Sequence, residues 1–199
     1  MSKPRFIFDA EHKRALTISD MERARIGERL WLAELSKIPP TAKHYAKLHG
    51  YIKNIETHFD MGTGIVLGGP HGSGKSGAAV IVAKEVLQRG CSALFMEEAA
   101  LVGAVIENTM FDDTFTMKER AMDVALLVVD DLGLSAQTEN NHIIENIVKH
   151  RVHRRLVTII TTNLIKDEYL KRYMTLASAM REAAIPIYCS GVDWREGIR

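Results

Sequence analysis

Residues Gly69 to Ser76 have the types and the spacing that bind phosphate groups. Glycines let a loop wrap so that its backbone N–H groups point at phosphate oxygens, Lys75 supplies a positive charge for the terminal phosphates, and the Ser76 hydroxyl can ligate a magnesium ion. The positive end of a helix that starts here would attract the same anion. The segment therefore predicts a site for ATP and Mg²⁺, with contacts from Gly69, Pro70, His71, Gly72, Ser73, Gly74, Lys75 and Ser76.

A second group of polar residues comes from two segments further along the chain. Asp130 and Asp131 follow the apolar run 125–129, and Asn163 stands just past the apolar run 157–161. Asp130 is predicted to hold Mg²⁺ through water, opposite the loop serine, and Asp131 to orient the water that attacks the γ-phosphate. Asn163 is a neutral donor and acceptor for that water or for a phosphate oxygen. Paired aspartates after a strand also cap helices or make turns, but the phosphate loop favours the catalytic interpretation.

These residues need a scaffold that brings distant segments together, and the hydrophobic pattern predicts one. Short continuous apolar runs, typical of strands buried on both faces, alternate with stretches of helical spacing. Such alternation implies an α/β fold with a parallel sheet and right-handed crossovers, in which ligands bind at the carboxyl ends of the strands. We expect strands at 65–67, 93–96, 125–129, 157–161 and 187–188, and helices at 78–87, 98–108, 139–155 and 166–183.

The region before the first strand is expected to be helical. Ser19 and Glu22 have capping-box spacing and open a helix that stops before Pro39. We expect a second helix that has Thr41 as its cap and ends at Gly62 and Gly64. One of its faces is apolar and lies against a core or a partner, as shown by the spacing of Tyr45, Leu48, Ile52, Ile55 and Phe59.

The chain has 199 residues and 46% hydrophobic content, which suits one compact domain with a modest appendage. We divide it into a partner-binding tail and helix, residues 1–39, and a main domain, residues 40–199. The first eighteen residues show no sustained period and are interpreted as a flexible or partner-dependent tail.

Composition excludes several other classes of protein. With 26 Lys and Arg against 25 Asp and Glu, no general basic field exists for nucleic acid or an anionic membrane. Cys91 and Cys189 are predicted to be buried free thiols, and the eight histidines lack metal-ligand spacing. Because there is neither a signal peptide nor an apolar run near eighteen residues, we expect a cytoplasmic protein with no membrane contact.

Five short motifs occur in a set order along the chain. They are Gly-Pro-x-Gly-x-Gly-Lys-Ser at 69–76, Leu-Leu-Val-Val-Asp-Asp-Leu-Gly at 126–133, Arg151, Thr-Ile-Ile-Thr-Thr-Asn-Leu at 158–164 and Gly-x-Asp-Trp-Arg at 191–195. In type and order they resemble those of the DnaC/IstB-like branch of the AAA+ ATPases, a group of replicative-helicase loaders and transposition ATPases. The resemblance covers roughly residues 40–199.

The resemblance implies an AAA+ P-loop core, with a parallel five-stranded sheet flanked by helices, little or no C-terminal lid and a short helical N-terminal extension. It implies that Asn163 is the sensor 1 residue and that Arg195 is sensor 2, reaching the γ-phosphate. It also implies an arginine that reaches a neighbouring subunit's ATP site, but Ala179 stands there. Since such an arginine contributes several orders of magnitude to hydrolysis, we expect weak ATP hydrolysis, unless Arg181 or Arg172 substitutes.

The distribution of charge bears on contacts with DNA. The segment 97–117, where the family is expected to touch single-stranded DNA, carries five acidic residues and no Lys or Arg, so phosphates would be repelled there. Near the end of the expected helix 139–155 lies a basic group, which could contact DNA phosphates or a neighbour's nucleotide. Its charges also suit the negative end of a helix dipole. The group consists of Lys149, Arg151, Arg154 and Arg155.

The resemblance implies an ATPase that loads a DnaB-like replicative helicase onto single-stranded DNA in DNA replication, as an oligomer of its own or one templated by the helicase. The first alternative is an IstB-like transposition ATPase that recruits a transposase on duplex DNA. A second alternative is a nucleotide-gated assembly module with little hydrolysis, which Ala179 favours. The motifs of the core do not separate these functions.

Overall fold

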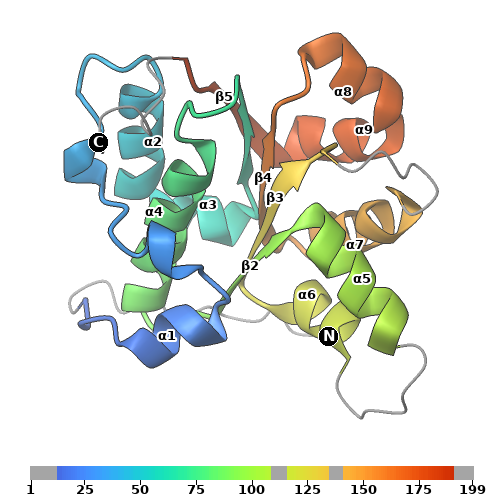
Figure 1. Cartoon of the computed structure of the whole chain (residues 1–199), viewed down its shortest axis with the longest axis horizontal. Coiled ribbons are helices and arrows are strands. Elements are labelled where there is room, and N and C mark those ends of the chain that lie inside the picture. The colour runs from blue at the N-terminus through green and yellow to red at the C-terminus, as the bar shows by residue number, and fades with distance from the viewer. Residues whose placement is uncertain (1–12, 109–115, 135–140, 191–199) are drawn as a thin grey trace.

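The structure is a computed structural model and describes residues 13–108, 116–134 and 141–190 (Figure 1). The strands are β1 (Gly64–Gly68), β2 (Ala93–Glu97), β3 (Leu126–Leu132), β4 (Val157–Thr162) and β5 (Ala184–Tyr188). The helices before the middle of the chain are α1 (Ile18–Arg23), α2 (Tyr45–Lys53), α3 (Ile55–Met61) and α4 (Lys75–Gln88). They are followed by α5 (Glu98–Asn108), α6 (Met117–Asp123), α7 (Asn141–His153), α8 (Lys166–Arg172) and α9 (Met174–Ala183).

The strands form one parallel sheet in the order β2-β3-β4-β1-β5. The predicted α/β class and the five-stranded parallel sheet are therefore confirmed. The central strands β3 and β4 are buried along almost their whole length, as their continuous apolar runs predict. Because all strands run the same way, their carboxyl ends share one edge of the sheet.

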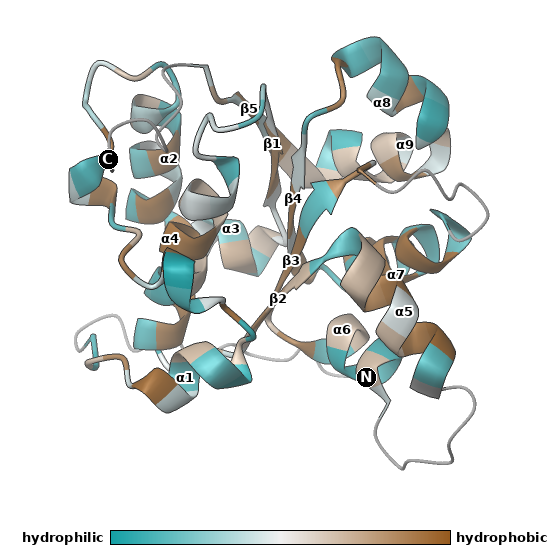
Figure 2. Cartoon of the chain, in the orientation of Figure 1, coloured by the Kyte–Doolittle hydropathy of each residue, from teal (hydrophilic) through white to brown (hydrophobic). Residues whose placement is uncertain are grey.

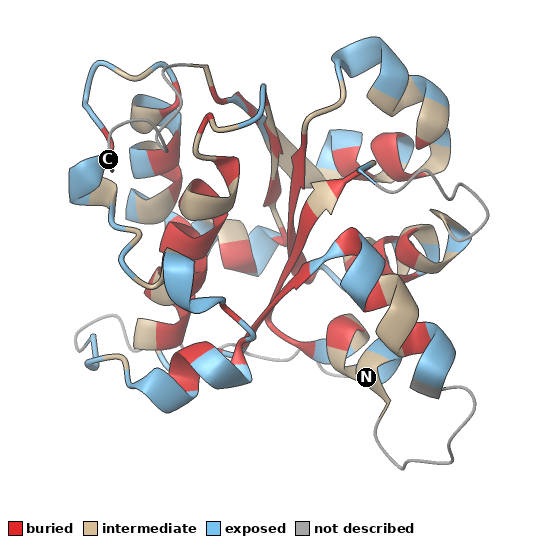
Figure 3. Cartoon of the chain, in the orientation of Figure 1, coloured by how far each residue is buried: buried red, intermediate tan, exposed pale blue. Residues whose placement is uncertain are grey.

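Two hydrophobic cores lie on the two faces of the sheet. In Figure 1 the helices α1–α4 cover one face and α5–α9 the other. Alternate residues of β3 belong to different cores: Leu126 and Val128 pack with α4, and Leu127 and Val129 pack with α7. Hydrophobic residues gather along the strands (Figure 2), and these residues are buried (Figure 3). This period of two is what a strand covered on both sides requires.

The prediction of a single helix between Ser19 and Pro39 is wrong. The capping box is made by Thr17 and Asp20, and α1 ends at Arg23. Two short 3₁₀ turns follow, at Glu28–Leu30 and Leu35–Lys37. The chain leaves the helix because the Ala24 carbonyl accepts a hydrogen bond of 2.8 Å from the backbone N–H of Phe95, and so joins the edge of β2.

Two other expected helices are each divided in two. The helix expected from Thr41 begins only at Tyr45, after His44, and is interrupted at Asn54, between α2 and α3. Helix α3 does end at Gly62 in the left-handed conformation, as predicted. The helix expected at 166–183 is interrupted at Tyr173, which separates α8 from α9. Helix α6 was not predicted, and Thr116 begins it with a capping box.

The described residues before Pro39 pack on the same core as α4. Met21, Ala24 and Ile26 are buried in that core, and the Lys13 ammonium pairs with Glu85 of α4 at 2.7 Å. The packing of residues 13–38 is therefore continuous with that of the main domain.

Within the described ranges, every helix is too short or too polar to cross a membrane.

Candidate nucleotide-binding site

The phosphate loop lies between β1 and α4, at the carboxyl edge of the sheet. Its glycines have positive φ angles: 150° at Gly69, 74° at Gly72 and 85° at Gly74. At Gly69 a side chain would also collide with the Cys189 carbonyl, since a Cβ there would lie 2.1 Å from its oxygen. Only glycine fits such a close approach with this backbone. The conformation turns the loop back on itself before α4 starts at Lys75.

Lys75 is held inside this loop. Its side chain is buried, and its ammonium donates hydrogen bonds to the carbonyl oxygens of Gly69 at 2.9 Å and Pro70 at 2.6 Å. The Ser73 hydroxyl donates to the same Pro70 oxygen at 2.8 Å. Burying an ammonium group destabilises the fold unless its protons have acceptors. The loop carbonyls supply these acceptors and also fix the position of the charge. His71, by contrast, is exposed on the loop.

A bulge in β3 places the two aspartates. Val129 pairs with Ile160 and Leu132 with Thr162, so that Asp130 and Asp131 together face the single residue Thr161. Asp131 has a φ of 54°, in the left-handed region. Bulges of this kind redirect side chains and are frequent beside active sites. The strand therefore continues through both aspartates, whereas the sequence predicted that it would end at residue 129.

Thr161 fills this bulge with its hydroxyl group. The hydroxyl donates to a carboxylate oxygen of Asp130 at 2.6 Å and accepts the backbone N–H of Asp131 at 2.9 Å. The residue is fully buried. A single side chain thus fixes both aspartates, and sequence analysis did not name it as a site residue. The signal available in the sequence was a threonine near the end of a buried strand, next to the strand that carries the two aspartates.

The environment of Asp130 suits a cation. Its carboxylate is 1% exposed. Burial raises its pKa most, the charge of Asp131 raises it further, and hydrogen bonds from the hydroxyls of Thr161 and Ser76 oppose these effects. Ser76 and Asp130 are therefore neighbours, although they come from α4 and β3. Mg²⁺ prefers one or two protein oxygens with water in the remaining positions, so this oxygen pair fits the ion.

Asn163 lies beside the second aspartate. Its Nδ2 is 3.4 Å from a carboxylate oxygen of Asp131, and its Oδ1 is buried without a hydrogen-bond partner among the described residues. A buried amide oxygen of this kind is an acceptor available to a ligand. The structure thus brings Lys75, Ser76, Asp130, Asp131 and Asn163 to one edge of the sheet, from three different strand ends.

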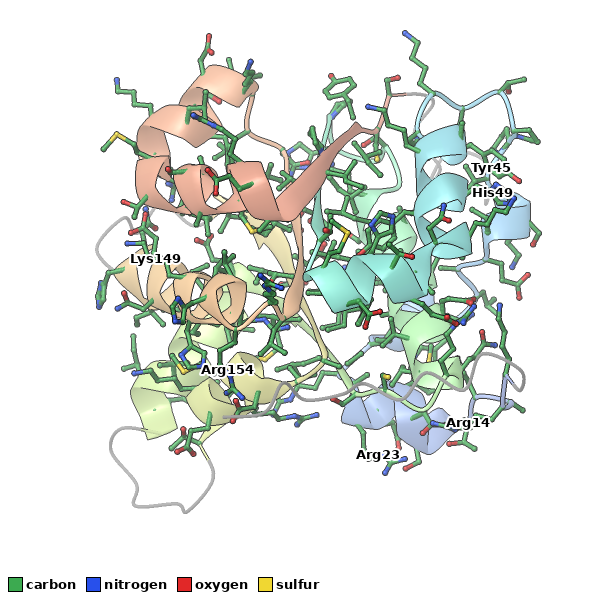
Figure 4. The ribbon with its side chains drawn as sticks, turned by 180° about the vertical axis from the view of Figure 1, so that it is seen from behind. Arg14, Arg23, Tyr45, His49, Lys149 and Arg154 are labelled. Atoms are coloured by element: carbon green, nitrogen blue, oxygen red, sulfur yellow. The ribbon has the colours of Figure 1, made fainter. Side chains whose placement is uncertain are left out.

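The basic group of α7 lies at the other edge of the sheet. Since α7 leads into the amino end of β4, its last turn is remote from the phosphate loop. Lys149, Arg154 and Arg155 are exposed there, and Lys149 and Arg154 lie on the outer side of the molecule (Figure 4). Arg154 pairs with Asp123 at the end of α6.

Arg151 differs from the rest of this group and corrects the prediction. It is fully buried. Its guanidinium donates to the carbonyl oxygens of Ala121, Val124 and Val157, at 2.8, 2.8 and 2.6 Å. Further contacts are the Met122 and Ala125 carbonyls at 3.4 and 3.3 Å and the Thr158 hydroxyl at 3.0 Å. Burial lowers the pKa of Arg151 to about 9. Arg151 therefore joins α6, β3 and β4 and does not present its charge to DNA or to a neighbour.

The candidate arginines of the C-terminal region have different surroundings. Arg181 is exposed on α9, and Ala179 is half-buried on the same helix. Arg172 donates to the Gly133 carbonyl at 2.9 Å, within its own subunit. Arg195 lies outside the described residues.

Glu98 is a further buried group near the site that sequence analysis did not identify. It opens α5, and one carboxylate oxygen accepts the backbone N–H of Gly133 at 2.9 Å. The other accepts the hydroxyl of Tyr173 at 2.7 Å. In the sequence this residue stands in an acidic stretch, and nothing there distinguishes it from its exposed neighbour Glu97.

Sequence comparison links the chain to a known family of proteins. The model of the family of IstB-like ATP-binding proteins matches residues 52–184. Among curated proteins, none matches the chain.

Solved structures show the same fold. A structure of the DnaC helicase loader has a TM-score of 0.69 at 21% identity and covers 82% of this chain and 100% of its own. A primosome component from Streptococcus pyogenes has a TM-score of 0.67 at 17% identity, with 90% of this chain and 99% of its own covered. DnaA from Aquifex aeolicus, bound to AMPPCP, has a TM-score of 0.61 at 14% identity, with 78% and 50% covered. The predicted AAA+ P-loop core is thereby confirmed.

Proposed function

The chain belongs to the family of IstB-like ATP-binding proteins, and from this premise we propose that it is an ATP-controlled loader of a replicative helicase. In this proposal it binds ATP and Mg²⁺, assembles with a ring-shaped helicase of the DnaB type and helps to place the ring on single-stranded DNA during replication. The observation that carries the ATPase part is the shared hydroxyl of Thr161, which holds Asp130 and Asp131 together at the edge where the phosphate loop lies.

Each site residue has a proposed role. The loop N–H groups and Lys75 bind the phosphates. Ser76 and Asp130 would hold Mg²⁺, which neutralises phosphate charge when it is bound. Asp131 orients the attacking water and accepts its proton, and Asn163 uses its free amide oxygen to position the same water. Arg195, with Arg181 from a neighbouring subunit, is proposed to reach the γ-phosphate.

The loading part is supported by likeness in fold and by the surface of the N-terminal segment. The chain in the structure of the DnaC helicase loader is covered completely. Before Pro39, Ile18 and Leu32 are 63% and 72% exposed although both are large and apolar. Exposed apolar side chains of this size favour contact with another protein. We therefore assign the helicase contact to residues 1–39, and contact with DNA phosphates to the exposed residues Lys149, Arg154 and Arg155.

A second candidate function follows from the family itself. IstB-like proteins give their name to the model that matches residues 52–184, so a transposition ATPase that assembles on duplex DNA and recruits a transposase fits the same core. A third reading, a module that binds ATP to assemble but hardly hydrolyses it, is favoured by Ala179. Restoring an arginine with Ala179→Arg would raise hydrolysis sharply if the first reading holds, and would leave it unchanged if the third does.

The deciding experiment is size and mass determination of the purified chain, combined with an ATPase assay. It is run with ATP or with AMPPCP, each without DNA, with single-stranded DNA and with duplex DNA, and then with a DnaB-type helicase. The matched control is Lys75→Ala, which removes the only charge of the phosphate loop.

If the chain is a helicase loader, we expect it to assemble only with nucleotide together with single-stranded DNA or the helicase ring. The Lys75→Ala control should not assemble. Filaments that form only on duplex DNA would contradict the loader and favour the transposition ATPase. A chain that stays monomeric with helicase, nucleotide and DNA together would contradict both.

A further inference from the structure

The break between α8 and α9 is tied to the turn that follows Asp131. Tyr173 occupies the break, and its hydroxyl donates to Glu98 at 2.7 Å. The same carboxylate accepts the backbone N–H of Gly133, two residues after Asp131, at 2.9 Å. Arg172, the last residue of α8, donates to the carbonyl of Gly133 at 2.9 Å. Both backbone groups of Gly133 are therefore bonded to side chains of other elements.

These contacts are buried, which makes them costly to break. Glu98 is 4% exposed and Tyr173 is fully buried. A buried carboxylate or phenol destabilises a fold unless its hydrogen bonds are made, and here each is the other's partner. Burial and the Glu98 carboxylate both raise the pKa of Tyr173, so the phenol keeps its proton and remains a donor at neutral pH. The pattern of residues 166–183 predicted one continuous helix, and the residue at which the structure interrupts it, Tyr173, is the one bonded to Glu98.

The turn at Gly133 has little freedom of its own. Its φ is +90°, and a Cβ at this position would lie 2.5 Å from a methyl carbon of Leu164, just after β4. Asp131 is likewise in the left-handed region, with its N–H bonded to Thr161. A shift of the Asp131 backbone is therefore passed through Leu132 to Gly133, and from there to the side chains that hold Gly133.

We propose that Glu98 and Tyr173 are positioning residues that make the turn from Asp131 to Gly133 and the helices α8 and α9 move as one unit. Nucleotide bound beside Asp131 then changes the position of α9, whose exposed Arg181 and Ser178 face outward. The role is distinct from binding or catalysis, because neither residue belongs to the phosphate loop or to the aspartate pair. The inference rests on the proposed ATP site.

The physical requirement is a difference in contacts between two states. A ligand shifts a conformational equilibrium only by as much as it binds one state better than the other. Here the part that senses nucleotide is the strained Asp131 backbone, and the connection is the set of hydrogen bonds at Gly133. Without the Tyr173 hydroxyl, Glu98 still holds Gly133 but no longer holds Tyr173, and Arg172 remains as the link from the end of α8 to Gly133.

The test measures hydrogen exchange of the amides of α9, Met174–Ala183, in the full chain with and without AMPPCP and Mg²⁺. The variants are Tyr173→Phe, which removes one hydroxyl, and Glu98→Met, which keeps the size of the side chain but removes both acceptor oxygens. The matched control is Tyr169→Phe, because the Tyr169 hydroxyl is buried on α8 without a hydrogen-bond partner among the described residues. AMPPCP affinity is measured for each protein.

In the wild type and in Tyr169→Phe, nucleotide is expected to change exchange of α9 by about fivefold or more, the usual lower range of coupling between sites. In Tyr173→Phe and Glu98→Met this change is reduced, with the Arg172 contact to Gly133 remaining, while AMPPCP affinity stays within about twofold of the wild type, since the phosphate loop is untouched. If Tyr173→Phe does not fold, Glu98→Met alone decides.

Two results would overturn the inference and leave the ATP site standing. One is a normal response of α9 in Glu98→Met, and the other is a wild type that binds AMPPCP with no response of α9 at all. If AMPPCP affinity in the two variants falls in parallel with the response of α9, the contact between Glu98 and Tyr173 only supports the fold, and the inference is again overturned. Failure of the wild type to bind AMPPCP would remove the proposed function together with this inference.

Discussion

Two ends of the sheet bury charges, and they do so in different ways. At the amino end Arg151 spreads its guanidinium over carbonyl oxygens of α6, β3 and β4 in addition to the Thr158 hydroxyl. At the carboxyl end the hydrogen-bond partners of Asp130 among the described residues are hydroxyl groups, and it has a second carboxylate beside it and a left-handed backbone next to it. The first charge is fully matched by the fold. The second retains unmatched charge and strain, which a bound cation and phosphates would relieve.

The comparison separates a structural buried charge from a functional one. Both kinds are costly to bury, so burial alone does not distinguish them. What distinguishes them is whether the protein itself supplies all the partners. Arg151 has them, whereas Asn163 keeps an amide oxygen without a partner in the described chain.

The largest effect is expected from Arg151→Met. It should lower the free energy of unfolding by about 3–5 kcal/mol, because several buried carbonyls lose their donor at once. Urea unfolding measures this change. The control is Arg154→Met, whose partner Asp123 is half-exposed and which should cost less than about 1 kcal/mol. Equal losses in the two variants would contradict the structural role of Arg151.

At the other edge, Lys75→Ala should reduce ATP affinity by about 100-fold or more, close to 3 kcal/mol, because a charged hydrogen bond to phosphate is lost. Titration calorimetry or a fluorescent ATP analogue gives the affinity. Lys47→Ala serves as the control, since this exposed lysine of α2 only approaches the Pro186 carbonyl, at 3.4 Å. Unchanged affinity in Lys75→Ala would exclude the loop as the phosphate site.

A more selective effect is expected from Asp131→Asn. ATP affinity should be kept, because the loop and Asp130 are untouched, while turnover falls by about 100-fold through loss of the base that orients water. A single-turnover assay with labelled ATP measures both quantities. Persistent turnover would show that Asp131 does not activate water.

The smallest effect has the opposite sign. Asp130→Asn should raise the stability of the nucleotide-free protein by about 1 kcal/mol at pH 7, since a charge placed for function is removed. The pKa of Asp130 is raised in the fold, so its ionised form destabilises the folded state above that pKa. As the pH falls toward the ordinary aspartate pKa, the wild type takes up the proton and the difference between the two proteins closes.

Thermal unfolding at several pH values tests this last expectation. Asp123→Asn is the control at the opposite edge, where the carboxylate is exposed and the difference should stay near zero at neutral pH. A less stable Asp130→Asn at pH 7 would mean that Asp130 is a structural charge like Arg151.

Much of the scaffold follows directly from the sequence. Four continuous apolar runs predicted β1 to β4 within a few residues, because a strand covered on both faces must be apolar throughout, whereas β5 at the sheet edge was predicted only over residues 187–188. The phosphate loop was also readable, since its function depends on backbone conformations that only local glycines permit. The order of strands and helices then required that the loop, the aspartates and Asn163 meet at one edge.

The tertiary structure decided what depends on partners distant in the sequence. Arg151 looked like one of four surface cations, and only the carbonyls of Ala121, Val124 and Val157 make it structural. Glu98 looked like one acid among several until Tyr173 and Gly133 were placed beside it. Periodicity reports how a residue faces its own helix or strand, but the partner of a buried polar group is chosen by packing between elements, which no local pattern encodes.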